Sequence, residues 1–162
     1  RRPPRSTLDR SSAASDVYKR QSICFWDKMN CNFKVMAKTK TSPVHIQVQT
    51  NYIPERSDPS KPIFFFSYHI KISNHGEDTV QLKNRYWHIT DGNGNIEEIR
   101  GPGVVGNKPF IPYGESFEYT SFCPLPTEFG VMHGHFEMID AHGKKFNAKI
   151  SPFRLSIPFS VN

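Results

Sequence analysis

Residues 63–73, Ile-Phe-Phe-Phe-Ser-Tyr-His-Ile-Lys-Ile-Ser (IFFFSYHIKIS), show the clearest secondary-structure pattern in the chain. Successive side chains of a β-strand point to opposite faces of a sheet, so every second residue shares a face. One face of this stretch is entirely apolar or aromatic and consists of Phe64, Phe66, Tyr68, Ile70 and Ile72. The alternation predicts a half-buried strand whose apolar face, including Phe64, Phe66 and Tyr68, lies in a core.

Shorter alternating stretches lie on both sides of this strand, and turn-forming residues separate them. They are residues 45–50, 79–91, 95–100, 115–121, 131–140, 145–150 and 153–158. Many short strands at this spacing, with no convincing helical periodicity, predict an all-β fold. We expect a fibronectin type III-like or immunoglobulin-like β-sandwich of about eight or nine short antiparallel strands, with Trp87 and Phe136 in its core. The fibronectin type III form fits better, because no cysteines flank Trp87 on the facing strands.

Two features of residues 79–94 refine this prediction. The alternation slips between Leu82 and Trp87, which predicts a bulge or bend near Asn84. Residues 91–94, Asp-Gly-Asn-Gly, are the strongest hairpin signal in the sequence, because Asp-Gly and Asn-Gly favour the positive φ angles of primed two-residue turns. We therefore expect residues 79–91 and 95–100 to pair as a hairpin.

Residues 100–106, Arg-Gly-Pro-Gly-Val-Val-Gly, contain the spacing G-x-G-x-x-G, which is typical of loops that bind the pyrophosphate of a dinucleotide. In those loops the last glycine opens a helix whose amide groups meet the phosphates, but here Pro109 and Pro112 oppose a helix. A structural role of the glycines is therefore favoured, and a loop of backbone amides that binds an anion is the alternative. The candidate anion-binding residues are Arg100, Gly101, Gly103, Gly106 and Lys108.

His133-Gly134-His135 is a candidate metal site. Alternate residues of a strand share a face about 6.8 Å apart, so both imidazoles can approach one transition-metal ion. A third ligand would have to come from a neighbouring strand, since two ligands make a weak site. The alternative is that His133 and His135 belong to a solvent-facing surface opposite the apolar residues of the same strand.

The sequence contains no evident catalytic arrangement. There is no G-x-S-x-G motif, and Cys123 precedes Pro124 without a helix that would lower the pKa of its thiol. Glu97 and Glu98 are neighbours on a strand and therefore face opposite ways. We expect a protein that is not an enzyme and needs no cofactor.

Aromatic residues suggest a different kind of function. Phe65, Phe122 and Phe129 occur where alternation or loop context leaves them partly exposed. Exposed aromatic residues on a sandwich indicate a partner-binding surface more often than a cofactor pocket. We therefore expect a protein partner.

The formal net charge of the 162-residue chain is +6, but it is unevenly distributed. Residues 1–21 contain six Lys or Arg and two Asp, which accounts for +4. Their ending, SDVYKRQ, resembles a translated sequencing adapter, so we expect residues 1–21 to be a translation artefact. Together with residues 22–35 they form an expected disordered leader, followed by one domain at residues 36–162. Met29 and Met36 are the two candidate start positions.

The composition of the rest of the chain restricts the cellular location and the partners that we expect for the protein. From residue 36 onward 13 basic residues nearly balance 12 acidic ones, which gives no basis for nucleic-acid binding. No stretch approaches the ~18 apolar residues of a membrane span, and no signal peptide is evident. Three cysteines provide no disulfide framework. We expect a cytoplasmic protein, either a monomer or a homodimer that pairs through edge strands.

Four sequence blocks occur in a characteristic order. They are D-T-V-Q-L at 78–82, W-x-I-x-D at 87–91, G-x-G-V-V-G at 101–106 and G-E-x-x-x-Y-x-S at 114–121. From about Val44 to Asn162 the chain resembles the bacterial ApaG family, whose domain recurs in some eukaryotic F-box proteins and in a polymerase-delta-interacting protein. The positions that match the family are Trp87, Asp91, Gly101, Gly103, Gly106, Gly114, Glu115, Cys123 and Pro124. The family usually has His at Tyr86 and Gly at Phe122.

The resemblance implies a fibronectin type III-like sandwich in a family whose molecular function is not settled. The family label mentions cobalt and magnesium efflux, but a chain without a membrane span cannot itself carry ions across a bilayer. We therefore predict a non-enzymatic module that mediates protein–protein interaction through one sandwich face or the 100–114 loop, with only an indirect link to cobalt and magnesium homeostasis. The alternatives are a sensor of pyrophosphate, a nucleotide or a divalent metal, and a phosphoanhydride hydrolase.

Overall fold

The computed structural model describes residues 36–41 and 43–158, which belong to one compact unit. The predicted leader at residues 1–35, including segment 1–21, lies outside the described residues. The strands are β1 (Met36–Thr41), β2 (Val44–Tyr52), β3 (Phe64–Asn74), β4 (Val80–Asp91), β5 (Ile96–Pro102), β6 (Phe110–Ile111), β7 (Ser116–Leu125), β8 (Phe129–Asp140) and β9 (Lys145–Ser156), and one short 3-10 helix, η1, spans Pro54–Arg56. Within this part of the chain no helix is long and apolar enough to cross a membrane.

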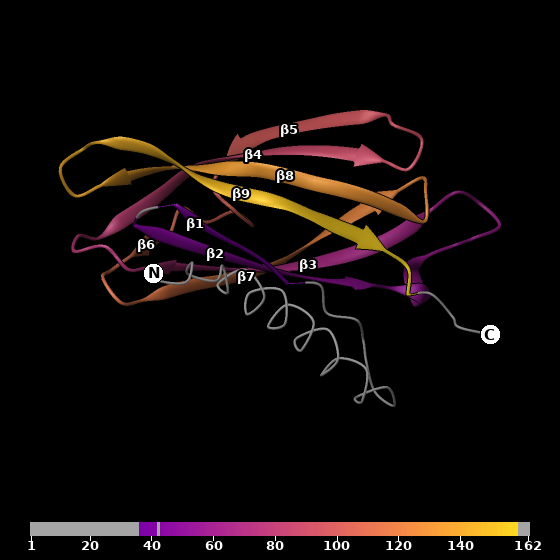
Figure 1. Ribbon diagram of the computed structural model, residues 1–162, viewed down its shortest axis with the longest axis horizontal. Helices are drawn as coiled ribbons and strands as arrows, with labels where there is room; N and C mark the ends of the chain where they lie inside the picture. The colour runs from indigo at the N-terminus through magenta and orange to yellow at the C-terminus, as the bar shows by residue number, and fades with distance from the viewer. Residues whose placement is uncertain (1–35, 42, 159–162) are drawn as a thin grey trace, which may run out of the picture. The chain divides into compact units, whose positions relative to one another are not determined.

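The strands form two antiparallel sheets that lie face to face (Figure 1). One sheet has the order β1-β2-β3-β7, and the other has the order β5-β4-β8-β9 with the short β6 also paired to β4. Three strands, β2-β3-β7, thus face four strands, β5-β4-β8-β9, as in a fibronectin type III sandwich, and β1 adds an edge strand. The predicted all-β sandwich is confirmed.

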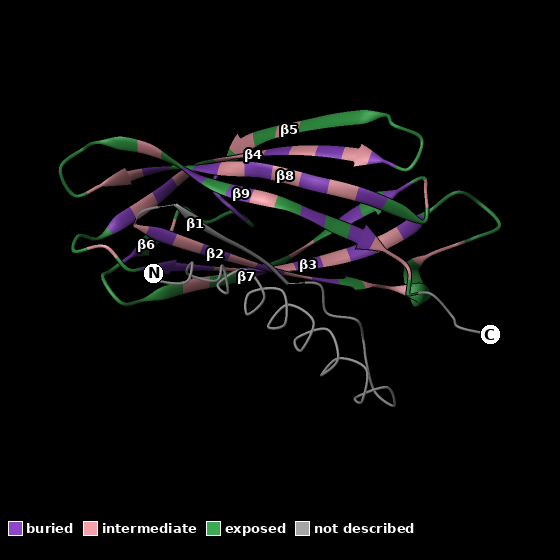
Figure 2. Ribbon diagram, viewed as in Figure 1, coloured by how far each residue is buried: buried purple, intermediate pink, exposed green. Residues whose placement is uncertain are grey.

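Alternate side chains of the strands fill the space between the sheets, as the banding along β3 and β8 in Figure 2 shows. Phe64, Phe66 and Tyr68 lie on the buried face of β3. Trp87 on β4 is also buried, and its ring centroid lies 5.5 Å from Tyr68 and 6.0 Å from Phe136. Edge-to-face pairs of this kind contribute about 0.5–1.5 kcal/mol each beyond area burial. Because Tyr68 belongs to one sheet and Trp87 to the other, the Tyr68–Trp87 contact joins the two layers, whereas the Trp87–Phe136 contact lies within one sheet.

A bulge interrupts the pairing of β4 with β8. Leu82 pairs with Met138 and Asn84 pairs with Glu137, so Lys83 is an extra residue on β4. This irregularity lies where the sequence predicted a bend, and it turns the end of β4 at Lys83.

A second bulge lies in β9, which is one continuous strand. Ser151 and Pro152 together lie opposite His133 on β8. The prediction of two separate strands at 145–150 and 153–158 is wrong, because a bulge accommodates a proline that cannot donate a ladder hydrogen bond. Strands β1 and β6 were also not predicted, since neither Met36–Thr41 nor Phe110–Ile111 shows the alternation of apolar and polar residues.

The β4–β5 and β8–β9 hairpins close with the same turn. The amide of Asp91 donates to the carbonyl of Asn95, and the amide of Asp140 donates to the carbonyl of Lys144, both at 3.0 Å. Gly94 and Gly143 occupy equivalent positions, with φ of +86° and +80°. The hairpin predicted at residues 91–94 is confirmed, but Gly92 has no positive φ. The turn is therefore a three-residue loop ending in a left-handed glycine, and not the predicted primed turn.

Candidate functional site

The glycine-rich stretch leaves β5 and makes a tight turn without entering a helix. Val104 and Asn107 exchange backbone hydrogen bonds of 2.8 and 2.9 Å. The two residues between them, Val105 and Gly106, have φ of +47° and +77°, as a primed turn requires. Val104 is fully buried and ties the turn to the core.

Arg85 on β4 braces the start of this turn. Its Nη1 donates to the carbonyls of Pro102 and Gly103 at 3.1 and 2.8 Å. A Cβ atom on Gly101 would lie 3.2 Å from the Arg85 guanidinium, and one on Gly103 would lie 2.2 Å from the carbonyl oxygen of Asn107. Gly103 thus allows a close backbone approach that no larger residue permits, whereas a side chain at Gly101 would crowd only the mobile end of Arg85.

The rest of the segment is tethered to the edge of β4. The carbonyl of Pro109 accepts from the amide of Leu82 at 3.1 Å, and the short β6 pairs with residues 80–81. Ile111 of β6 is buried, and its carbonyl accepts from Nδ2 of Asn74 at 2.9 Å. We refer to residues 103–114 as the edge loop. Each of its ends is hydrogen-bonded, since the amide of Gly103 donates to the carbonyl of Lys83 on β4 and the amide of Gly114 donates to the carbonyl of Asn74.

The edge loop carries three large apolar side chains that face solvent. The exposed fractions are 60% for Val105, 68% for Phe110 and 67% for Tyr113. The sequence pointed to the 100–114 loop as a possible contact region, but it did not single out these side chains. Among the aromatic residues expected at the surface, Phe122 and Phe129 are exposed, while Phe65 is half-buried. Arg56 lies over both Phe65 and Phe122, 4.8 and 5.2 Å from the ring centroids.

The candidate anion-binding residues do not surround one space. The amides of Gly103, Val104 and Asn107 donate to backbone carbonyls and so do not point toward a ligand. The guanidinium of Arg100 lies 4.4 Å from the centroid of the Tyr86 ring on the outer face of the sheet. Lys108 instead lines a cleft together with Lys83 and Asn84 of β4.

The two histidines of the candidate metal site lie on the outer face of β8, and each contacts a ring on β4. His133 stacks on His88 with the centroids 4.5 Å apart, and His135 lies 5.0 Å from the Tyr86 ring. Burial, His88 and Lys149 lower the pKa of His133. The sequence missed His88, because the register of β4 against β8 is not visible in the sequence. Within the described ranges, no three His, Cys, Asp or Glu side chains are grouped closely enough to hold a metal ion.

Packing against β4 explains why the residue between the two histidines, Gly134, is glycine. A Cβ atom at this position would lie within 1.9 Å of the carbonyl oxygen of Tyr86 and 3.2 Å from the Cα of Trp87. The backbones of β4 and β8 therefore approach closely only because residue 134 is glycine.

Cys123 is buried on β7 and is unpaired. Burial, and secondarily the charge of Glu97, raises the pKa of its thiol to about 12. The thiol lines a small cavity of about 110 Å³ together with Trp87 and Glu97. A thiol this hard to ionise is a poor nucleophile at neutral pH. Glu97 and Glu98 pair with Ile89 and His88, and hence face opposite sides of β5.

The molecule is a small fibronectin type III-like sandwich, and its edge loop displays exposed apolar side chains. A model of the ApaG domain matches residues 54–140. The chain is 46% identical to Protein ApaG of Beijerinckia indica subsp. indica over 125 residues, which is 77% of this chain and 96% of that protein. It is also 46% identical to Protein ApaG of Mesorhizobium japonicum over 123 residues, covering 76% and 95% of the two chains.

A solved structure agrees with these sequence matches. A crystal structure of an ApaA protein from Bordetella pertussis superposes with a TM-score of 0.70 at 40% identity, over 76% of this chain and 98% of that chain. The chain belongs to the ApaG family. The names of these relatives state no activity.

Proposed function

We propose that this protein is a non-enzymatic binding module and that its edge loop contacts a protein partner. The observation that supports this most is the display of Val105, Phe110 and Tyr113 by one short segment, each at least 60% exposed. Grouped exposed apolar residues mark interaction sites in soluble proteins. Aromatic residues in particular are enriched at protein interfaces.

The rigidity of the edge loop supports the same role. Arg85, Asn74 and the backbone of β4 fix its conformation before any partner arrives. A pre-organised loop loses little conformational entropy on binding, so more of the contact energy contributes to affinity. Val105 has φ of +47°, which is unfavourable for a β-branched residue. Such backbone strain is concentrated at functional positions.

The test compares a variant of the full-length protein that loses exposed apolar side chains of the edge loop with one that loses an exposed apolar side chain elsewhere. The first is the double variant Phe110→Ser and Tyr113→Ser. The control is Ile96→Ser, because Ile96 is 62% exposed on β5, outside the edge loop. Proteins captured from the natural host by each form are identified by mass spectrometry, and the dissociation constant of each purified candidate is then measured by calorimetry.

We expect the double variant to weaken the partner's affinity at least about tenfold, since truncated interface aromatics cost about 2 kcal/mol or more. The Ile96→Ser control should bind like the parent protein. Sedimentation velocity of the same proteins shows whether the partner is a second copy of this chain. Equal affinities for the double variant and the control would refute a contact through the edge loop, provided that circular dichroism shows both variants folded.

A further inference from the structure

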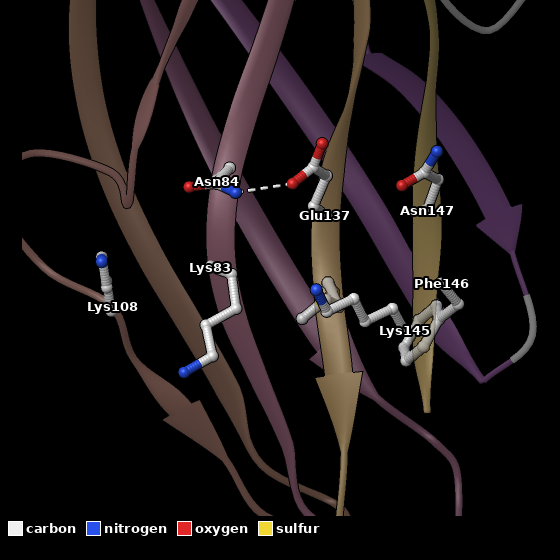
Figure 3. Close-up of a pocket in the computed structure, with 8 residues that line it drawn as sticks. Lys83, Asn84, Lys108, Glu137, Lys145, Phe146 and Asn147 are labelled. Carbon is white, nitrogen blue, oxygen red and sulfur yellow. Dashed lines mark hydrogen bonds between the residues drawn. The ribbon is translucent and has the colours of Figure 1, made fainter. Parts of the chain in front are cut away.

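A cleft with a volume of about 510 Å³ lies where the edge loop meets β4, β8 and β9. Its lining residues are Lys83 and Asn84 of β4, Lys108 of the edge loop, Glu137 and Met138 of β8, and Lys145, Phe146 and Asn147 of β9. In Figure 3 the Lys145 side chain extends from β9 across β8 toward β4, which carries Lys83, and Lys108 lies beyond β4 on the edge loop. Three lysines from three separate segments therefore line one cleft.

The three positive charges of this cleft outnumber its one negative charge, Glu137. Neither Lys83, Lys108 nor Lys145 forms an ion pair with any residue in the described ranges. The one carboxylate of the lining, Glu137, accepts a hydrogen bond of 2.6 Å from Nδ2 of Asn84 (Figure 3). Two other surface lysines, Lys61 and Lys71, do have acidic partners, Asp58 and Glu118. Three lysines against one carboxylate leave the cleft with an excess of positive charge, so an anion would be favoured there.

The backbone explains why the lysines gather. Lys83 is the extra residue of the β4 bulge, and its carbonyl accepts from the amide of Gly103 at 2.8 Å. Lys108 is held beside it, because Nε2 of Gln81 donates to the Lys108 carbonyl at 3.2 Å. Lys145 is the first residue of β9, directly after the turn that Asp140 closes. Each lysine is thus placed by main-chain contacts and leaves its ammonium group for a ligand.

We propose that this cleft binds a small molecule that carries at least two negative charges on phosphate groups. Lysine binds phosphate as a point charge, and three lysines match a multiply charged anion. A cleft of this volume is within the range of small-molecule sites, about 300–1,000 Å³, and exceeds what a single ion needs. Met138 is buried in the core and Phe146 packs against it, so the exposed amide of Asn147 would contact the organic part of the ligand.

This site is independent of the proposed protein partner. None of Val105, Phe110 and Tyr113 lines the cleft, so loss of one function would leave the other measurable. It also differs from the G-x-G-x-x-G hypothesis, because Lys108 alone is common to the cleft and to the residues named for that loop.

The probe is inorganic pyrophosphate, titrated into the full-length protein at ionic strength held constant with chloride. We expect saturable binding by calorimetry, with amide NMR shifts concentrated at Lys83, Lys108 and Lys145. Lys83→Gln and Lys145→Gln should each weaken the affinity about tenfold, as expected for loss of a charge-assisted contact. The matched control is Lys144→Gln, which removes the same charge from the neighbouring residue outside the lining and should change the affinity less than twofold.

A variant that should bind pyrophosphate more tightly provides a control, because misfolding would weaken binding. Glu137→Gln removes the only negative charge of the lining and keeps an oxygen that can accept from Asn84, so it should bind pyrophosphate several-fold more tightly. The proposal is overturned if Lys144→Gln and Lys145→Gln weaken binding equally, or if binding does not saturate. If a phosphoserine peptide binds more tightly than pyrophosphate, the natural ligand is a phosphorylated protein segment, and the proposal of a small-molecule ligand is wrong.

Discussion

At the scale of single residues, Gly103 and Gly106 belong to one motif but have different surroundings. Both have positive φ, +61° and +77°. A side chain at Gly103 would collide with the Asn107 carbonyl, whereas the space beside Gly106 is open. We predict that Gly103→Ala lowers the free energy of unfolding by about 3 kcal/mol, because a backbone clash adds to the strained φ.

The matched variant for this prediction is Gly106→Ala. It should cost only about 1–2 kcal/mol, since it introduces a left-handed alanine without a clash. Urea denaturation of both variants measures the difference. Equal destabilisation would mean that Gly103 is not held close to Asn107 in solution.

His133 provides a second prediction at this scale, because two basic groups face it, His88 from β4 and Lys149 from β9. Burial and these neighbours lower its pKa, so the fold favours the neutral imidazole. The unfolded chain then binds more protons, and stability should fall as the pH drops below about 6.5 toward the lower folded pKa. We predict that His88→Gln raises the pKa of His133, as measured by NMR titration of the imidazole carbons. An unchanged pKa would show that His88 does not contribute and that burial and Lys149 lower it.

At the scale of elements, the two hairpins that close with an aspartate and a left-handed glycine are directly comparable. Gly143 has φ of +80° and open space around its Cα. Gly143→Ala should lower the free energy of unfolding by about 1 kcal/mol, because alanine disfavours this conformation. Gly143→Asn should cost less, since asparagine tolerates positive φ better. Thermal unfolding of both variants tests this order, and a reversed order would contradict it.

The sequence predicted elements well where alternation was strong and poorly where it was absent. The face of β3 that carries Phe64 and Phe66 was evident from period two alone. Pro152 split the prediction for β9, because a sequence does not reveal that a bulge places a proline outside the ladder. The contact of His133 with His88 depends on the pairing register of β4 and β8, which is a long-range property.

At the scale of the whole sandwich, topology brings together residues that are far apart in the chain. Lys83, Lys108 and Lys145 belong to three segments, and no local pattern in the sequence links them. The sequence named Lys108 only because it follows the glycine motif. The class of fold could therefore be predicted from the sequence. The cleft could not, because it depends on the strand order β4-β8-β9 and on the bulge at Lys83.

The bracing of the edge loop has a consequence for protein engineering. Its backbone is fixed by Arg85, Asn74 and β4, while Val105, Phe110 and Tyr113 project outward from it. The shape of the loop is thus largely independent of which side chains it displays. Randomising these three positions, with glycine or asparagine included at residue 105, would produce a library of binding surfaces on a constant framework. Exposed substitutions of this kind usually change stability by no more than about 0.5 kcal/mol.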